Sequence, residues 1–365
     1  MKAAFFRAPG QPIVIREVDM PEAGPNEVLV KVRRCGICGS DVSMTGDVPF
    51  TFSPGPIGHE YSGEIVEIGS AVTGLKVGQR IACLPTTPCG TCEGCRFGNP
   101  IFCLAPQGLE KGQRYGGFGE YVAMPVGGAK PIPDWLSYSD GALVEPMACG
   151  LHAIAMAGMA PGTKVLVLGA GSMAMSVVYW ARRLGAGRIV VASRSTRRRD
   201  LAYAMNADAF HSFSDDETAA LSSKLGGAPD LVAECVGKNG MLGLALEHVR
   251  PQGTIISLGM CQHAEPVLPA ACSFKEVRMF FPVGYTVDEF VATARAFEAD
   301  LIHPDMMVSD TISLGALPNT LEELRRGSRE GAKIHVDPFA DGEEASGTIH
   351  DVEQRRATKR SLQSM

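Results

Sequence analysis

Short runs in which apolar and polar residues alternate characterise roughly the first 150 residues, which are also rich in glycine and proline. Alternation with a period of two is typical of strands with one buried face, because successive side chains point to opposite sides. Turn residues separate the runs, so the pattern predicts a mostly β domain with irregular loops. The clearest runs are Val28–Val32 (VLVKV), Tyr61–Ile68 (YSGEIVEI) and Gln79–Cys83 (QRIAC).

The pattern changes at Pro161, after which continuous apolar runs alternate with stretches of helical character. Continuous apolar runs indicate strands buried on both faces, and their alternation with helices predicts a parallel sheet covered on both sides. The predicted strands are Lys164–Leu168, Arg188–Ala192, Asp230–Ala233 and Thr254–Leu258, and the predicted helices are Met173–Leu184, Asp200–Met205 and Met241–Val249.

From about Phe290 the chain reads as helices and short strands that end at Lys333–Val336 (KIHV), and we expect this part to return to the first domain. After Asp337 the sequence has few large apolar residues and mixed charge, which predicts a mobile or weakly helical appendage. The expected organisation is a first domain of residues 1–152 and 290–337, a second domain of residues 153–289, and a polar tail of residues 338–365.

Composition then narrows the class of protein. A chain of 365 residues with 45% hydrophobic and 20% charged residues can form two soluble domains, each with its own core. No apolar run approaches the ~20 residues that span a bilayer, and the N-terminal segment lacks the apolar stretch of a secretory signal. The net charge of −6 argues against general nucleic-acid binding, which needs a basic face. Eleven cysteines, an odd number with four crowded into one loop, favour a reducing compartment. We therefore expect a cytoplasmic enzyme.

A glycine-rich turn follows the first strand of the second domain. The segment GAGSMA (169–174) fits the G-x-G-x-x-G/A pattern between a buried strand and a helix. Gly169 permits the tight turn, Gly171 lets the backbone approach a pyrophosphate, and Ala174 is small enough for close packing of helix and strand. The helix N-terminus at Ser172 and Met173 then faces the phosphates. Such turns follow many strands, but within this strand–helix series the pattern predicts a dinucleotide site.

The end of the next strand indicates which nicotinamide cofactor is used. NAD enzymes have an Asp or Glu there, about 20 residues beyond the glycines, to bind the ribose 2′-hydroxyl. This chain has SRSTRRR (193–199) instead. An arginine fork can hold a 2′-phosphate by paired, charge-assisted hydrogen bonds. A solvated basic loop is the alternative, but the position favours NADP(H) over NAD(H), with Arg194 as the first contact and Ser193 and Arg198 next.

Four cysteines lie close together in the loop PCGTCEGCRFGNPIFC. Four thiolates at this spacing, with turn glycines between them, can complete a tetrahedral zinc site that leaves no ligand position open. The spacing therefore predicts a structural zinc; disulfides fit poorly with a reducing compartment, and a zinc ribbon for nucleic acid fits poorly with the acidic charge. The four predicted ligands are Cys89, Cys92, Cys95 and Cys103.

A second set of metal-binding residue types is dispersed. Cys38 lies just past a strand, His59 follows a glycine, and Glu145 lies in the segment VEP. A cysteine, a histidine and a carboxylate that leave a fourth position for water or substrate are typical of a catalytic zinc. Spacing alone leaves alternatives, because Cys35 and Cys38 also read as a redox C-x-x-C pair and His59 as an ordinary loop histidine.

Six segments occur in an order that resembles the zinc-containing medium-chain dehydrogenase/reductase family. They are CGICGSD, GHEYSGEIVEIG, the four-cysteine loop, YGGFGEYVAMP, GALVEPMACGLHA and VLVLGAGSMA. The resemblance covers residues 1 to about 337, and VEP, GYT (284–286) and the final KIHVDP look closest to the 2,3-butanediol and sorbitol (polyol) dehydrogenase branch. It implies an α/β fold in which a GroES-like, mostly β catalytic domain joins a Rossmann domain, a doubly wound parallel sheet.

The resemblance also implies roles at a catalytic zinc. Cys38 and His59 match zinc ligands, with Cys35 as a packed neighbour of Cys38. Glu145 stands at the third-ligand position, whereas Glu60 matches a carboxylate near the zinc that relatives can exchange onto the metal. Which of the two carboxylates is the resting ligand stays open.

Two more residues match a proton path, and two positions depart from the family pattern. Asp41 matches a residue that orients the ligating imidazole, and Ser40 matches the hydroxyl at which the proton relay begins. Relatives commonly have a histidine where this chain has Ser43, so proton exit is expected through water. Polyol dehydrogenases tend to have an arginine where this chain has Gly284, before Tyr285, which favours a smaller or less polar diol or hydroxyketone over sorbitol.

The expected activity is reversible hydride transfer between a secondary alcohol, diol or polyol (or its ketone) and NADP(H), with one catalytic and one structural zinc. Ser40, Cys38, His59 and Glu60 would carry the chemistry. Two alternatives are a sugar or threonine-type dehydrogenase that uses NAD(H) on the same scaffold, and a non-catalytic regulator that binds zinc and nucleotide. The expected partner is a small-molecule alcohol or ketone, with no nucleic acid or membrane, in a homodimer or homotetramer.

Overall fold

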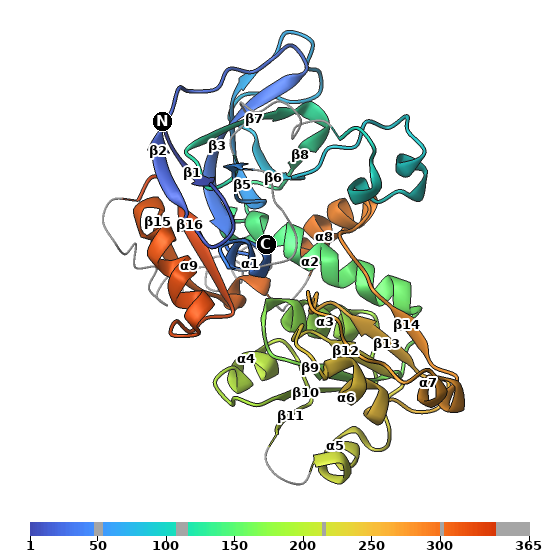
Figure 1. Ribbon diagram of the computed structural model, residues 1–365. Coiled ribbons are helices and arrows are strands. Elements are labelled where there is room, and N and C mark those ends of the chain that lie inside the picture. Colours follow the sequence, from blue (N-terminus) through green and yellow to red (C-terminus); the bar gives the residue numbers. More distant parts are fainter. Residues whose placement is uncertain (47–53, 107–115, 214–216, 300–302, 341–365) are drawn as a thin grey trace, which may run out of the picture.

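The computed structural model of the chain describes residues 1–46, 54–106, 116–213, 217–299 and 303–340, with side chains for these residues except 217–219 and 298–299. In Figure 1 a β-rich lobe, built from the N-terminal third and the last described segment, lies above a lobe with a second sheet. The long helix α2 (Tyr138–Ala157) lies between them. No helix in these ranges is both long and apolar enough to span a membrane.

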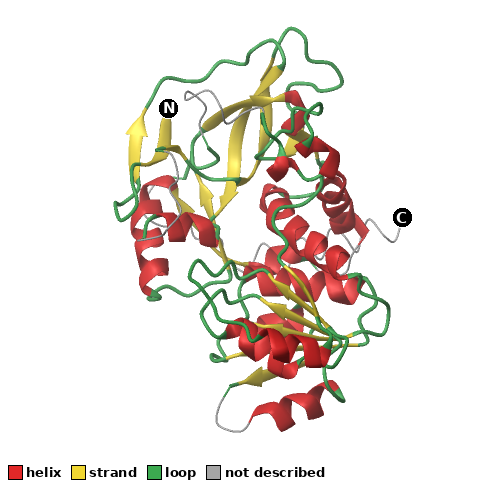
Figure 2. Cartoon of the chain, turned by 45° about the vertical axis from the view of Figure 1, so that its right-hand side comes forward, coloured by secondary structure: helices red, strands yellow, loops and turns green. Residues whose placement is uncertain are grey.

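The lower lobe contains a parallel sheet with the strand order β11-β10-β9-β12-β13-β14. The central strands are buried along almost their whole length, because helices cover both faces, as Figure 2 shows. The strands are β9 (Lys164–Leu168), β10 (Arg188–Ser193), β11 (Ala209–Ser212), β12 (Leu231–Glu234), β13 (Thr254–Ser257) and β14 (Arg278–Phe280). The helices are α3 (Ser172–Arg183), α4 (Arg199–Ala204), α5 (Glu217–Leu225), α6 (Met241–His248) and α7 (Pro269–Lys275).

The upper lobe contains a mostly antiparallel sheet with the order β15-β16-β3-β5-β6-β8, to which β7 adds by pairing with β3, and a small sheet β2-β1-β4. The first sheet consists of β3 (Glu27–Gly36), β5 (Glu60–Ile68), β6 (Arg80–Cys83), β7 (Tyr121–Pro125), β8 (Ala129–Pro131), β15 (Val308–Ser313) and β16 (Lys333–Asp337). The small sheet consists of β1 (Lys2–Phe6), β2 (Val14–Glu17) and β4 (Gly55–Pro56). Helices α1 (Gly39–Met44), α8 (Val287–Ala299) and α9 (Leu317–Arg326) and short 3₁₀ turns complete the lobe.

Helix α2 joins the two lobes because it is apolar around most of its circumference. It begins at the cap residue Ser137, whose hydroxyl accepts a hydrogen bond from the Asp140 amide. Leu143, Val144 and Met147 are fully buried in the largest hydrophobic cluster, which also contains side chains of β9 and α3. A helix that is apolar all round belongs in a core rather than on a surface. The position of Glu145 in the middle of this helix is therefore rigid.

The expected combination of a mostly β lobe and a doubly wound parallel sheet is confirmed. The predicted strands and helices all exist, and their bounds differ by at most one residue except in β3, which continues to Gly36, four residues beyond the predicted end at Val32. Four elements of the second domain were not predicted, namely β11, α5, α7 and β14. They lack a long apolar run, and β14 is only three residues long. The chain returns to the first sheet through β15 and β16, as expected, and Val336 of β16 pairs with Cys35 of β3.

The expected polar tail begins with residues that contact the first domain. The Phe339 ring meets the Tyr121 ring edge to face at 5.7 Å, and the Lys31 ammonium lies 4.4 Å from the Phe339 ring centroid. Residues 338–340 are thus docked rather than part of an appendage, because a half-buried aromatic side chain packs against side chains of β3 and β7. Residues 341–365 of the predicted tail lie outside the described residues.

Candidate active site

Cys38 lies at the point where strand β3 ends and helix α1 begins. Its backbone is extended, and its amide donates a hydrogen bond of 2.9 Å to Asp41 Oδ2 in the first turn of the helix. Asp41 is fully buried, and burial raises the pKa of its carboxyl above the ordinary value, although the charge of His59 opposes this rise. The short helix therefore fixes the Cys38 thiol and the Asp41 carboxylate relative to each other.

His59 immediately precedes strand β5 and faces Asp41. Its Nδ1 lies 3.6 Å from Asp41 Oδ1, a buried atom with no hydrogen-bond partner among the described residues. Burial lowers the pKa of His59, but the charges of Asp41, Cys38 and Glu145 outweigh burial, and the pKa lies well above its ordinary value. Because Nδ1 faces a carboxylate, Nε2 is the ring nitrogen left for another ligand.

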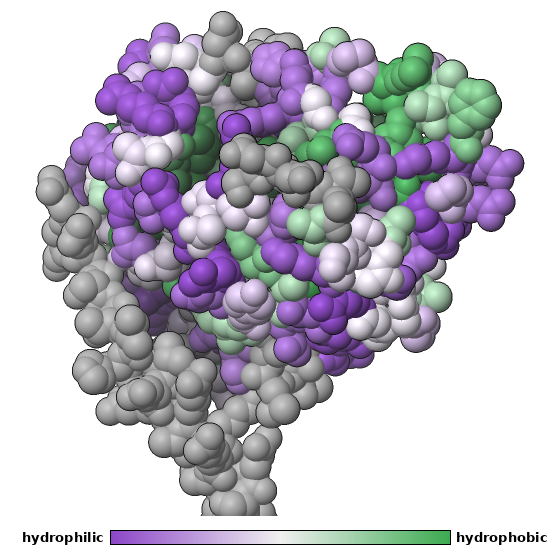
Figure 3. Space-filling view, turned by 90° about the horizontal axis from the view of Figure 1, so that it is seen from below, coloured by the Kyte–Doolittle hydropathy of each residue, from purple (hydrophilic) through white to green (hydrophobic). Residues whose placement is uncertain are grey.

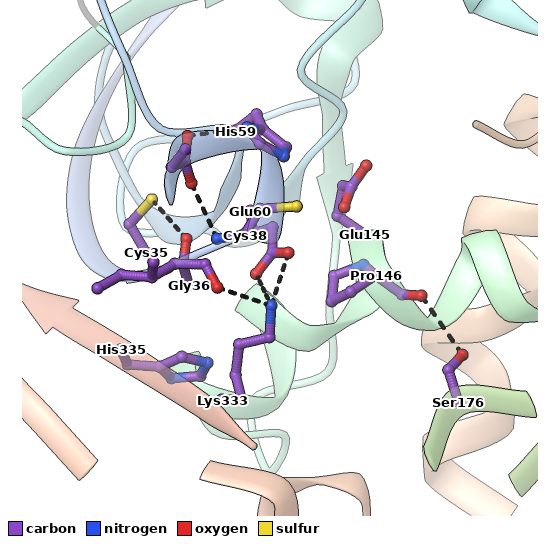
Figure 4. Close-up of polar contacts among 12 residues, drawn as sticks. Cys35, Gly36, Cys38, His59, Glu60, Glu145, Pro146, Ser176, Lys333 and His335 are labelled. Carbon is purple, nitrogen blue, oxygen red and sulfur yellow. Dashed lines mark hydrogen bonds and ion pairs between the residues drawn. The ribbon is translucent and has the colours of Figure 1, made fainter. Parts of the chain in front are cut away.

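Cys38, His59 and Glu60 form a cluster whose ligand atoms all lie within 4.8 Å of one another. A zinc ion at about 2.3 Å from sulfur and about 2.0 Å from nitrogen would have such ligands in reach of one centre. The donor set and the unpartnered Asp41 oxygen behind the imidazole both fit a metal. Figure 4 shows the three side chains with Glu145 beside them on α2. Glu145 is not among the three clustered residues.

Glu60 has a second partner that the sequence did not indicate. Both of its carboxylate oxygens accept hydrogen bonds from the Lys333 ammonium, at 2.7 and 2.6 Å, and Lys333 also donates to the Ile37 carbonyl at 3.0 Å. Both side chains are almost completely buried. Burial lowers the pKa of Lys333, but Glu60 outweighs it and leaves the pKa raised. Gly36 is needed beside this pair, because a Cβ there would lie 2.1 Å from Glu60 Oε2.

Glu145 also has a partner, because its Oε1 accepts a hydrogen bond of 2.9 Å from the Tyr285 hydroxyl. Burial raises the pKa of Glu145 to about 7, against the lowering effect of His59. Burial and the Glu145 charge in turn raise the pKa of Tyr285 well above its ordinary value. Tyr285 therefore fixes the orientation of the Glu145 side chain. The sequence did not indicate this hydrogen bond either.

A cavity of about 1100 Å³ opens over this cluster. Its wall includes Ser40 and His59 from the first domain and Glu145 and Tyr285 from α2 and the segment before α8. Ser40, the predicted start of the proton relay, is thus placed at the cavity, and Ser43 stands one turn further along α1 without a side-chain hydrogen bond to any described residue. A substrate in the cavity would have access to the Ser40 hydroxyl.

The four cysteines of the loop converge as a separate cluster. The Sγ–Sγ distances are 3.8 Å for Cys89–Cys95, 3.5 Å for Cys92–Cys95 and 3.8 Å for Cys92–Cys103. Four sulfurs at about 2.3 Å around a tetrahedral zinc would be about 3.8 Å apart, so the loop is already shaped for the ion.

The hydrogen bonds around this cluster favour thiolates. The Cys89 amide donates to Cys103 Sγ at 3.3 Å, and the Leu104 amide donates to Cys92 Sγ at 3.4 Å. Backbone hydrogen bonds from Thr91 and Cys92 lower the pKa of Cys89 to about 6, whereas desolvation and Cys92 raise that of Cys95 to about 12. Metal binding requires deprotonated sulfur, and part of the cluster is prepared for it.

The glycine-rich turn lies at the carboxyl end of β9, in the middle of the parallel sheet. Gly169 has φ of +105°, and a Cβ there would lie 3.1 Å from the Cys235 carbonyl, so only glycine fits without strain. Gly171 is the cap of helix α3, and the amides of Ser172 and Met173 follow at its N-terminus. Ala174 is fully buried against the sheet. This geometry is that of a phosphate site at a helix N-terminus.

The arginines predicted to select the cofactor lie beside this turn. Ser193 is half-buried at the end of β10, and Arg194 follows as an exposed side chain. Arg198 crosses back toward the turn, since its guanidinium donates to the Ala170 carbonyl and to the Gly331 carbonyl of the first domain. Partial burial lowers its pKa, although Glu330 opposes this effect.

Comparison with known proteins agrees with this geometry. The sequence matches the family models "Alcohol dehydrogenase GroES-like domain" over residues 24–134 and "Zinc-binding dehydrogenase" over residues 169–299. L-galactonate-5-dehydrogenase of Escherichia coli (strain K12) is 30% identical over 322 residues, 87% of this chain and 94% of that protein. Sorbitol dehydrogenase of Bacillus subtilis (strain 168) is 30% identical over 360 residues, 93% and 97% of the two chains.

A solved structure extends the similarity to three dimensions. The crystal structure of a zinc-binding dehydrogenase from Sinorhizobium meliloti 1021, bound to NADP, has a TM-score of 0.83 and 32% sequence identity. The comparison covers 92% of this chain and 99% of that one, so both lobes take part in the match.

Proposed function

The chain belongs to the family of zinc-binding medium-chain dehydrogenases, oxidoreductases of the alcohol and polyol type, and we propose that it transfers a hydride between a secondary alcohol, diol or polyol (or its ketone) and NADP(H). The observation that carries the proposal is the convergence of Cys38, His59 and Glu60 at a cavity lined by Ser40. These residues come from different parts of the chain, and nothing in the packing of the lobe alone requires a thiol, an imidazole and a carboxylate to meet there.

Cys38, His59 and one carboxylate would hold the catalytic zinc. We assign Glu60 as the resting third ligand, because its oxygen lies in the cluster whereas Tyr285 holds Glu145 outside it. Glu145 remains at the cavity wall, where it can accept a hydrogen bond from a substrate hydroxyl. When bound, zinc supplies a Lewis acid for the alcohol oxygen, and the nicotinamide accepts or returns the hydride.

The side chains then orient the reactants and move the proton. Asp41 orients the His59 imidazole through Nδ1. The Ser40 hydroxyl at the cavity can take the proton that leaves the alcohol. Because Ser43 stands where relatives commonly have a histidine, water next to Ser43 would carry the proton further. Tyr285 keeps Glu145 in place, and the walls of the cavity restrict water around the reacting carbon.

Cys89, Cys92, Cys95 and Cys103 would hold a second, structural zinc, since all four ligand positions are supplied by the protein.

The domain boundaries at residues 152, 289 and 337 remain part of the proposal. The eleven free cysteines are best suited to a reducing compartment, which supports a cytoplasmic location.

NADP(H) is proposed as the cofactor, on the turn Gly169–Gly171 and the following helix. Arg194 and Ser193 would contact the 2′-phosphate, and Arg198, which already lies at the Ala170 carbonyl, would contribute from the side of the turn. An acid that could bind a 2′-hydroxyl is absent from the end of β10. The NADP in the similar solved structure is consistent with this choice.

Self-association as a homodimer or homotetramer is proposed through the edge of the parallel sheet. Strand β14 is an edge strand, and large apolar side chains are exposed before and after it, namely Leu268, Phe274 and Phe281. In Figure 3, which shows the molecule from below, hydrophobic surface gathers at the upper right. Exposed apolar surface of this kind is typical of an interface.

The test is an absorbance assay at the nicotinamide band with the purified, zinc-loaded chain. Diols, hydroxyketones, polyols, sugars and simple alcohols are each offered with NADPH or NADP⁺ and with NADH or NAD⁺. We expect turnover of at least one secondary alcohol or ketone, with higher kcat/KM for the phosphorylated cofactor. Absence of turnover on every substrate, in a protein that holds its zinc, would overturn the proposal.

A further inference from the structure

The cavity has a second charged region besides the metal cluster. Ser40, His59 and Glu145 line it at the cluster, and Arg7 and Arg16 line it elsewhere, from the small sheet β2-β1-β4. The function proposed above gives these two arginines no role. A simple alcohol would fill little of a cavity of about 1100 Å³.

Strand pairing places Arg16 on the same face of the small sheet as Phe5. Arg16 of β2 pairs with Ala3 of β1, and Phe5 lies two residues further along β1, on the same face. The Arg16 guanidinium lies 5.3 Å from the centroid of the Phe5 ring, which also lines the cavity. This contact between a cation and a ring holds the arginine at the wall. Arg7 follows β1 directly.

No carboxylate of the described residues pairs with either guanidinium. Within the described ranges, Arg7 and Arg16 make no hydrogen bond and no ion pair, and both side chains are exposed. The acidic side chains of the cavity wall are engaged elsewhere, since Asp41 accepts from the Cys38 amide and Glu145 accepts from Tyr285. As far as the structure describes the chain, the cavity therefore presents two positive charges without an acidic partner.

We propose that Arg7 and Arg16 bind an anionic group of the substrate, so that the preferred substrate is a polyhydroxy chain with a terminal carboxylate or phosphate. This inference rests on the proposed function and names its substrate class. The guanidinium fork matches a carboxylate or a phosphate with paired, charge-assisted hydrogen bonds. A substrate that spans the cavity would place its oxidised hydroxyl at the metal cluster and its acid at the arginines.

The first experiment compares substrates with related polyhydroxy chains that differ in a charged or neutral terminal group. Zinc-loaded protein is assayed with galactonate and gluconate, with galactitol 1-phosphate and sorbitol 6-phosphate, and with neutral galactitol and sorbitol. We expect kcat/KM for one anionic class to exceed that of the neutral alditol about tenfold or more, the usual order for a charged hydrogen-bonded contact. The class with the higher value identifies carboxylate or phosphate as the natural anion. Equal values for charged and neutral substrates would overturn the inference.

The second experiment uses variants and salt. Arg16→Gln and the double variant Arg7→Gln/Arg16→Gln should reduce the ratio of anionic to neutral kcat/KM about tenfold, mainly through KM. Arg295→Gln, which removes an exposed charge of α8 outside the cavity wall, should leave the ratio unchanged. Salt at about 0.5 M should raise KM for the anion only, because exposed charges are then screened within a few ångströms. A ratio that survives the double variant contradicts the proposal.

Binding separates failure of this inference from failure of the proposed function. Should no polyol be turned over, thermal shift and titration calorimetry with gluconate and sorbitol still test the arginines without catalysis. Tighter binding of gluconate, lost in the double variant, would uphold the anion site while the hydride-transfer proposal fails. Equal binding of both ligands would overturn the anion site whether or not the enzyme is active.

Discussion

Lys333 and Glu60 meet although 273 residues separate them in the chain. Strand β16 brings Lys333 next to β3, and β5 brings Glu60 to the same place from the other side. A buried lysine at this position has no local sequence signal, because its partner is set only by the pairing of distant strands. The clustering of the four cysteines between positions 89 and 103, by contrast, was predictable, since their short spacing in the sequence alone keeps them together.

Removal of the Lys333 ammonium should destabilise the protein strongly. Lys333→Met leaves the Glu60 carboxylate buried without its partner, and the unfolding free energy should fall by about 3–5 kcal/mol. The second variant, Glu60→Gln in the Lys333→Met background, removes the unpaired charge and should restore a large part of that loss. Denaturant unfolding of the chelator-treated, zinc-free proteins measures both changes, because a bound zinc ion would otherwise pair with the Glu60 carboxylate. A Lys333→Met variant that costs little, with no recovery in the double variant, would show that the pair is not important for stability.

Arg194 governs the proposed choice of cofactor. Arg194→Gln should raise the Kd for NADPH about 10–100-fold, because a charge-assisted hydrogen bond to the 2′-phosphate is lost, and should leave the Kd for NADH nearly unchanged. Fluorescence titration with both cofactors measures this. Arg199→Gln is the matched control, because Arg199 pairs with its neighbour Asp200 in the first turn of α4, directly after this loop. A marked preference of the wild type for NADH would contradict the interpretation of the loop.

At the scale of elements, the loop of residues 89–103 depends on its proposed metal. Cys92→Ser should reduce the zinc content from two ions to one per chain and lower the thermal midpoint, since metal binding contributes directly to the folding of such loops. Cys272→Ser, at a half-buried cysteine of α7 outside both clusters, should keep both ions. Zinc is measured by elemental analysis after gel filtration. Full zinc content in Cys92→Ser would refute the four-thiolate site.

Strand β16 contains a histidine that should make stability depend on pH. Burial, with help from Lys333 and Arg34, lowers the pKa of His335 to about 3, whereas an unfolded histidine titrates near 6.5. Between these values the unfolded chain binds one proton more than the folded protein, so stability is lost as the pH falls below about 6.5. One unit below, at about pH 5.5, the loss from this group is about 1.4 kcal/mol.

A variant isolates this contribution. His335→Asn retains a polar atom near Ser139 Oγ, which lies 3.2 Å from His335 Nδ1, but cannot take up a proton in this range. Its deficit in unfolding free energy relative to the wild type should therefore be smaller at pH 5.5 than at pH 7.5, by about 1.4 kcal/mol. Denaturant unfolding at the two pH values measures the difference. An identical deficit at both would contradict the assignment of a buried neutral imidazole.

At the scale of the whole molecule, the sequence predicts the fold but not every contact of the site, because several of these contacts join distant segments of the chain. The strand that ends at Leu168 and the turn after it depend on residues close together in the chain, so the local sequence pattern predicts them. The Glu60 and Glu145 carboxylates occupy different positions because Lys333 binds the first and Tyr285 binds the second. Lys333 belongs to the last strand, and Tyr285 to the segment before α8. Arg198 likewise meets the Gly331 carbonyl only once both lobes are assembled.

The central claim is that distant side chains converge on a metal at which the alcohol reacts, and one comparison tests it most directly. Zinc content, NADPH affinity and turnover are measured together in the wild type, in Cys38→Ser, and in Cys35→Ala, whose fully buried thiol lies outside the cluster. Cys38→Ser should lose one of two zinc ions and at least about 100-fold in kcat, with NADPH affinity and the zinc of the loop intact. Cys35→Ala should keep both ions and its turnover. Near-normal turnover in Cys38→Ser would contradict the account.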